Sequence, residues 1–180
     1  MRLFVGIDLP DEIKQSILKF QAELKQLGVR GFWKAPDNFH MTLEFLGELD
    51  SKTLPLIREC LSSAGQDHSS FALTLGGLGA FPSFKRPHTL WTAVGGSIRE
   101  LNQLQNEIHT LLTQKGFSLE NRQFKPHITL ASRPDLREIE LGDHKTRKLG
   151  EFRVEGITLF ASSVIRGKRT YTALSHKKLQ

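Results

Sequence analysis

The chain has 180 residues, of which 38% are hydrophobic and 24% charged, and its formal net charge is +6 at pH 7. This is the composition of an ordinary globular domain with its own core, and the single cysteine, Cys60, excludes an intramolecular disulfide and a cysteine-based metal cluster. No apolar run is long enough to span a membrane and no signal peptide is recognisable, so we expect a cytoplasmic protein. The positive charge suits a polyanionic ligand, but many soluble proteins are equally basic, and charge alone leaves both interpretations open.

Strands and helices alternate in the first part of the chain. The apolar run at residues 3–9 predicts a strand, and Pro10 with the two acidic residues after it predicts the start of a helix that Gly28 ends. Three further elements follow in the order strand, helix, strand, at residues 39–46, 51–64 (with Ser51 as N-cap) and 71–78. The segment 79–87 is rich in Gly, Pro, Ser and basic residues and predicts a loop.

The second part of the chain repeats this order. We expect a strand, a helix ended by Gly116, a second strand, a partly helical stretch and two last strands, at residues 89–94, 98–112, 127–131, 135–149, 152–164 and 170–174. His40 and His127 occupy matching strands 87 residues apart. The pattern predicts an internal duplication within a single bilobal domain, residues 1–180, with repeat halves at roughly 1–80 and 88–180. The expected fold class is α+β, with two pseudo-symmetric lobes, each a small mostly antiparallel sheet with helices on its outer face, and a groove between them.

Two tetrapeptides of the form His-x-Thr-Leu carry the strongest functional signal. They are His40-Met41-Thr42-Leu43 and His127-Ile128-Thr129-Leu130. Alternate residues of a strand share a face, so the His and Thr of each copy should project together, with Glu44 and Ala131 next on that face and Phe45 on the opposite one. A lone copy is more often structural than catalytic, but two copies at matching positions of a repeat indicate one shared site.

Two imidazoles facing each other across a groove would form an acid–base pair. Because the pKa of histidine is about 6.5, one ring can be neutral while the other is protonated near neutral pH. Such a pair supplies a general base and a general acid for an in-line displacement at phosphorus, and the threonine hydroxyls can donate to the non-bridging oxygens. This scheme requires neither a metal nor another cofactor.

Longer segments around these motifs resemble the two-histidine (2H) phosphoesterase superfamily, and within it the bacterial and archaeal RNA 2′,3′-cyclic phosphodiesterases, formerly called 2′-5′ RNA ligases. The resemblance covers nearly the whole chain and is carried by residues 2–7, 33–48, 81–82 with 90–91, and 124–131. It implies hydrolysis of a 2′,3′-cyclic phosphate on an RNA end, or on a related cyclic nucleotide, to a 2′-phosphomonoester by a monomeric enzyme without a metal.

The same resemblance implies roles for individual residues. His40 corresponds to the proton donor for the departing 3′ oxygen, His127 to the base that activates water, and Thr42 and Thr129 to the phosphate ligands. Family members often have Arg directly after Thr-Leu-Ala; here Ser132 intervenes, which leaves Arg133 as a possible phosphate contact that would face the other way if the strand continues.

Three alternatives remain open from the sequence. The enzyme could join or cleave 2′-5′ linkages, since ligation and hydrolysis share a transition state, or the chain could be a non-catalytic module that binds RNA ends. Core packing is favoured over base stacking for the aromatic residues near the predicted loops: Trp33, Phe81 and Phe84. Lys85-Arg86 and residues 166–169 could steer RNA, and for 166–169 a solvated hairpin turn is the favoured interpretation. The remaining histidines lack the motif and are expected at the surface or in local hydrogen bonds: His68, His88, His109, His144 and His176.

Overall fold

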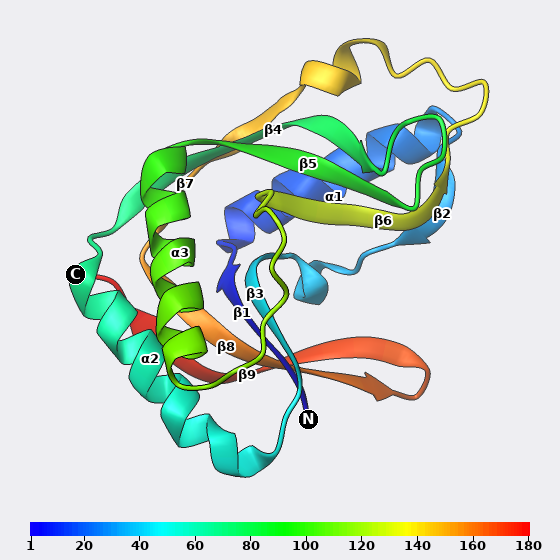
Figure 1. Cartoon of the computed structure of the whole chain (residues 1–180). Coiled ribbons are helices and arrows are strands. Elements are labelled where there is room, and N and C mark those ends of the chain that lie inside the picture. Colours follow the sequence, from blue (N-terminus) through cyan, green and yellow to red (C-terminus); the bar gives the residue numbers. More distant parts are fainter.

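The computed structural model describes all 180 residues, which form two antiparallel sheets and three α-helices (Figure 1). The first sheet has the strand order β3-β1-β8-β9 and the second the order β2-β6-β5-β4-β7. The first sheet contains β1 (Arg2–Asp8), β3 (His40–Glu48), β8 (Gly156–Ile165) and β9 (Lys168–Lys178). The second contains β2 (Arg30–Trp33), β4 (Phe71–Phe81), β5 (Thr89–Gly96), β6 (His127–Asp135) and β7 (Lys148–Val154). This architecture confirms the predicted α+β class.

The helices cover one face of each sheet. Helix α1 (Asp11–Gln26) lies against the second sheet, whereas α2 (Leu54–Asp67) and α3 (Ile98–Gln114) pack on each other and on the first sheet (Figure 1). Each helix buries an apolar stripe at helical spacing; in α1 the stripe is Ile13, Ile17, Phe20 and Leu24. Gly28 follows α1 with φ +99°, the left-handed conformation that ends helices and that glycine adopts without strain.

Both sheets contain strands from both parts of the chain. β1 and β3 lie in the first sheet, but α1, β2 and β4, which alternate with them along the chain, belong to the second sheet. In the second part, β5, β6 and β7 lie in the second sheet, while α3, β8 and β9 belong to the first. The chain therefore crosses repeatedly between the sheets, and a cluster of 34 buried apolar residues joins them into one core.

Several elements differ from the sequence-based expectation. The strand predicted at residues 152–164 is two strands, β7 and β8, which separate at Glu155 and lie in different sheets. β2 was not predicted, because it is short, begins Arg-Gly and has mostly exposed side chains. Ser51 is not the cap: the Asp50 carboxylate accepts from the Lys52 amide at 2.8 Å, and α2 begins after that turn.

None of the three helices combines the length and the apolar character that crossing a bilayer would need.

Candidate active site

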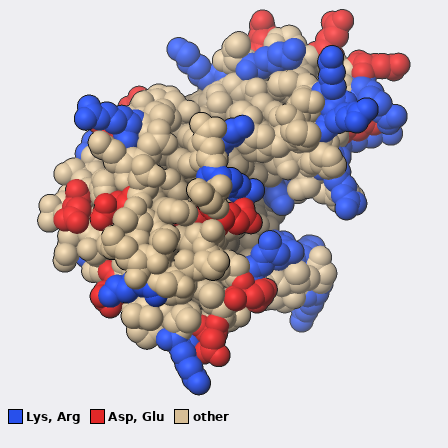
Figure 2. Space-filling model, viewed as in Figure 1, with Lys and Arg blue, Asp and Glu red and all other residues tan.

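A cavity of about 610 Å³ lies between the two sheets and is lined by the His and Thr side chains of both tetrapeptides. His40 and Thr42 line it from β3, and His127 and Thr129 line it from β6, so the structure brings all four predicted side chains to one space. A second recess of about 560 Å³ continues it and shares both threonines and His127. Figure 2 shows the surface hollowed on one side between the two lobes, with Lys and Arg side chains around the opening.

The imidazole of His40 is held by two hydrogen bonds. Its Nδ1 lies 2.9 Å from the carbonyl oxygen of Asn38, and its Nε2 lies 3.0 Å from Oγ1 of Thr42. A carbonyl can only accept, so Nδ1 carries the proton and Nε2 of the neutral ring accepts from the hydroxyl. Phe4 and Tyr171 pack on the ring, with centroid separations of 4.7 and 4.8 Å. The ring therefore has a fixed tautomer and little freedom to rotate.

His127 is held in the same way at its inner nitrogen. Its Nδ1 lies 2.6 Å from the carbonyl oxygen of Lys125, again two residues before the histidine, so its proton-accepting atom is also Nε2. The rings of Phe81 and Trp91 pack beside it, at centroid distances of 4.9 and 5.9 Å. Phe81 lies at the cavity, against an imidazole, so the expectation that it packs in the interior is only partly met.

Burial makes both imidazoles neutral in the free protein. Desolvation is the largest cause at His40 and lowers its pKa to about 4, with the charges of Lys34 and His127 acting in the same direction. Desolvation is also the largest cause of the lowered pKa of His127, and Arg122 adds to it. The charge of His127 is the smallest of the causes that lower the pKa of His40, which puts the two rings within electrostatic reach of each other.

Matching β-bulges interrupt the alternation after each His-Thr pair. β1 pairs Gly6 with Thr42 and Val5 with Glu44, which leaves Leu43 as the extra residue. β5 pairs Trp91 with Thr129 and Leu90 with Ala131, which leaves Leu130 as the extra residue in β6. One extra residue in a strand turns the side chains that follow it to the opposite face of the sheet.

The bulges overturn three predicted orientations. Glu44, expected beside His40, is only 7% exposed and lines the second recess instead of the first cavity; its carboxylate lies 2.7 Å from Nδ1 of His109 in α3 and also accepts from Gln105. Phe45, expected behind the strand, lines the cavity. In β6 Ala131 is fully buried, and Ser132 lines the cavity in its place.

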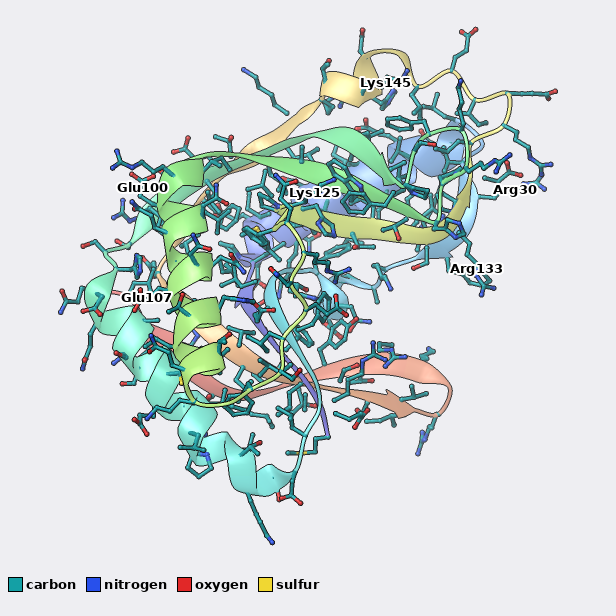
Figure 3. All side chains as sticks on the ribbon, in the orientation of Figure 1. Arg30, Glu100, Glu107, Lys125, Arg133 and Lys145 are labelled. Atoms are coloured by element: carbon teal, nitrogen blue, oxygen red, sulfur yellow. The ribbon has the colours of Figure 1, made fainter.

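Arg133 does not line the cavity. It is exposed, has φ +48°, and Figure 3 places it at the end of β6 opposite Lys125, with its side chain extending away from the protein body. The cationic residues that do line the cavity come from four separate segments: Arg2, Lys34, Arg122 and Arg169. No pattern in the sequence links these four, because tertiary folding alone brings them together. No group of three or more His, Cys, Asp and Glu side chains is arranged to hold a metal ion.

A buried glutamine fixes the bulge of β6. Gln21 of α1 is 1% exposed, and its Nε2 donates to the carbonyl oxygens of Lys34 and Leu130, both at 3.0 Å. The Lys34 amide donates to the same Leu130 oxygen at 2.9 Å. These hydrogen bonds connect α1, the end of β2 and the strand that carries His127. In the sequence, the only indication of them was one polar residue within the apolar stripe of the helix.

Curated relatives of this chain share one name. The RNA 2′,3′-cyclic phosphodiesterase of Aquifex aeolicus is 31% identical over 97% of this chain and 95% of its own length. The protein of the same name from Escherichia coli is 34% identical over 96% of this chain and 93% of its own length.

Solved structures agree with the sequence comparisons. Escherichia coli LigT without ligand superimposes with a TM-score of 0.79 at 31% identity, covering 99% of this chain and 96% of that one, and LigT has also been solved with 3′-AMP. A Thermus thermophilus protein has a TM-score of 0.85 at 24% identity, which supports the fold alone; it covers 99% of this chain and 98% of that one. The model of the LigT-like phosphoesterases matches residues 7–91 and 95–171, and the chain belongs to this family.

Proposed function

We propose that this protein is an RNA 2′,3′-cyclic phosphodiesterase that opens the cyclic phosphate to a 2′-phosphomonoester. Relatives of that name align over nearly the whole chain, and LigT with 3′-AMP is an example of a relative that binds a nucleotide. The observation that carries the proposal is the pair of imidazoles in one cavity. In each of them Nδ1 is bound to a carbonyl, so that Nε2 is the atom that can take up or give a proton. Two such groups suit a displacement in which one proton leaves and another arrives.

In the proposed reaction His127 is the base and His40 the acid. Nε2 of His127 takes a proton from water as the water oxygen forms a bond to phosphorus, opposite the 3′ oxygen. The bond between phosphorus and the 3′ oxygen breaks, and Nε2 of His40 gives its proton to that oxygen. The products are a 3′ hydroxyl and a 2′-phosphomonoester, and exchange with solvent returns each imidazole to its starting state.

The polarity is the one that the family resemblance implies, and it requires His40 to take up a proton when substrate binds. Burial lowers the pKa of His40 to about 4 and also lowers the pKa of His127, so neither ring is protonated near neutral pH in the free protein. A bound cyclic phosphate carries a negative charge that favours the protonated form of a neighbouring imidazole. Substrate binding should therefore protonate His40 only when there is a phosphate to cleave.

Thr42 and Thr129 are the proposed phosphate ligands. In the free protein the Thr42 hydroxyl donates to Nε2 of His40. A phosphate oxygen competes for that hydroxyl, and turning it to the phosphate would free Nε2 to take up the proton it later donates. Ser132 also lines the cavity and offers a third hydroxyl. We assign no phosphate contact to Arg133, because its side chain is outside the cavity.

The test uses adenosine 2′,3′-cyclic phosphate in buffer with EDTA. Wild-type protein should open the ring, and phosphorus NMR should show the 2′-phosphate. His40→Gln and His127→Gln should each lower kcat by about 10²–10⁴-fold, the usual contribution of one general acid or base. His68→Gln is the matched control, since His68 lies outside the cavity. Wild-type rates in either motif variant would end the proposal, and tight binding without turnover would indicate an RNA-end-binding module instead.

Both His-Thr pairs of the site belong to a single chain, so no second copy is needed to complete the pair, and we propose that the protein acts as a monomer. Light scattering on the eluting protein would test this, and a dimer mass would contradict it. The cytoplasmic location stays a prediction from the sequence.

A further inference from the structure

Three cationic side chains on one side of the cavity have no acidic partner. Arg2, Lys34 and Arg169 all line it, and none of them forms an ion pair. Arg122, the fourth cation of the cavity, differs because Glu120 binds it at 2.9 Å. The three unpaired side chains come from β1, from the residue after β2 and from β9, and they line the cavity together with His40.

Lys34 lines the same cavity as His40 and as Arg169 of the β8–β9 hairpin. Its backbone is tied on both sides, since its amide donates to Leu130 and its carbonyl accepts from Gln21. Burial, the largest cause, and the charge of Arg169 both lower the pKa of its ammonium group. The same ammonium opposes the protonation of His40. Lys34 is thus within electrostatic reach of His40 on one side and of Arg169 on the other.

Arg169 is fixed in place rather than free in solution. The Asn38 side chain donates to its carbonyl oxygen at 3.0 Å, and its own Nη1 donates to Oγ of Ser162 at 3.0 Å. Asn38 also supplies the carbonyl that orients His40. Asn38 therefore links the backbone of Arg169 to the orientation of the His40 ring.

Like charges held together in a partly buried groove repel, and an anion that binds among them removes that repulsion. The two His-Thr pairs account for one phosphate, the one that reacts. Lys34 and Arg169 line the same cavity and are additional to these pairs. Their donors suit the non-bridging oxygens of a phosphodiester, with Arg2 adding positive charge from the same side.

We propose that Lys34 and Arg169 form a second phosphate subsite, which binds the phosphodiester on the 5′ side of the terminal nucleotide. The proposal rests on the phosphodiesterase function and specifies its substrate class: RNA of at least two nucleotides, preferred over cyclic mononucleotides. Contacts of this kind address the backbone and carry no base information, so the preference should be independent of base sequence.

The test compares two adenosine dinucleotides that both end in a 2′,3′-cyclic phosphate and carry a 2′-O-methyl group on the upstream sugar. One has an ordinary internal phosphodiester, and the other has an uncharged methylphosphonate there. In the wild-type protein kcat/KM should be about tenfold higher for the charged linkage, the effect of one charge-assisted hydrogen bond. This ratio should fall as salt rises from 50 to 500 mM, because the contact is electrostatic.

Lys34→Gln and Arg169→Gln should each bring the ratio close to one. Arg166→Gln removes the same charge from the turn of the same hairpin, outside the cavity, and should keep the wild-type ratio. A wild-type ratio of one would overturn the proposal, as would variants that lose both substrates equally, since the cations would then serve the reacting phosphate. Failure of the wild-type protein to open adenosine 2′,3′-cyclic phosphate would instead refute the proposed function itself.

Discussion

The neutral state of His40 makes the stability of the folded protein depend on pH. Burial, the largest cause, lowers the pKa of His40 to about 4 in the folded protein. The unfolded chain should have the ordinary value of about 6.5. Below that pH the unfolded chain binds a proton at His40 that the folded protein does not accept until about pH 4, so acid favours unfolding throughout this interval.

The size of the effect follows from the two pKa values. A difference of about 2.5 pH units corresponds to about 3 kcal/mol of unfolding free energy, present at pH 7 and lost by about pH 4. The variant His40→Gln has no titrating group at this position. Whatever its stability at pH 7, it should lose about 3 kcal/mol less than the wild-type protein as the pH falls.

Urea unfolding followed by tryptophan fluorescence at half-unit pH steps would measure this difference, since the chain has two tryptophans. His68→Gln is the control and should show the pH dependence of the wild-type protein. If the free energies of wild-type protein and His40→Gln fall in parallel between pH 7 and 4, His40 is not buried in its neutral form and the reasoning is refuted. Proton NMR of the His40 ring gives a direct check, and added inorganic phosphate should raise the pKa that it reports.

Three further predictions follow from the site and its support. Gln21→Leu should lower the free energy of unfolding by about 2 kcal/mol, because the Lys34 carbonyl loses its partner while Leu130 keeps one; an unchanged urea midpoint would contradict the clamp. Glu44→Gln should cost about 1–2 kcal/mol through its weakened bond to His109, yet change kcat less than threefold, and a hundredfold loss of kcat would mean that Glu44 faces the cavity. Because burial lowers the pKa of both imidazoles, kcat/KM should have its optimum below pH 6.5, and an optimum above pH 7 would count against this assignment.

The sequence was sufficient to predict the fold class and the convergence of two His-Thr pairs. The helices were recognisable because apolar residues recur at helical spacing, as in α1 and α3, and because glycines follow both helices. The pairs were recognisable because strand alternation places His40 with Thr42 and His127 with Thr129, before any bulge intervenes. Local rules hold over these few residues.

The residues immediately after each pair could not be placed in the same way. A bulge at a leucine has no local sign, since Leu43 and Leu130 are ordinary strand residues. The contact that holds the second bulge comes from Gln21, which is 109 residues from Leu130 in the sequence. Tertiary hydrogen bonds thus decide which way the side chains after a bulge face. The bond between Glu44 and His109 is one of them, and Phe45 instead of Glu44 lines the first cavity.

The change of sheet at Glu155 was also beyond sequence reasoning. Residues 152–164 form one apolar, alternating run that is interrupted only by Glu155 and Gly156. Whether such a run continues in one sheet or passes to another depends on which strands are available as partners. Here β7 pairs with β4 and β8 pairs with β1, strands that lie far away in the sequence.

The interlaced strands allow the two histidines of this chain to differ. One half on its own would leave both sheets incomplete, whereas two identical copies would complete each other as a strand-exchanged homodimer, with the reacting phosphate on the symmetry axis. On such an axis the two imidazoles would be equivalent, and neither could specialise as acid or base. A single chain with two non-identical halves is free of that constraint. In this chain the residue paired with Thr42 is Gly6, whereas the residue paired with Thr129 is Trp91, and Tyr171 packs on His40 but not on His127, so each ring has its own surroundings.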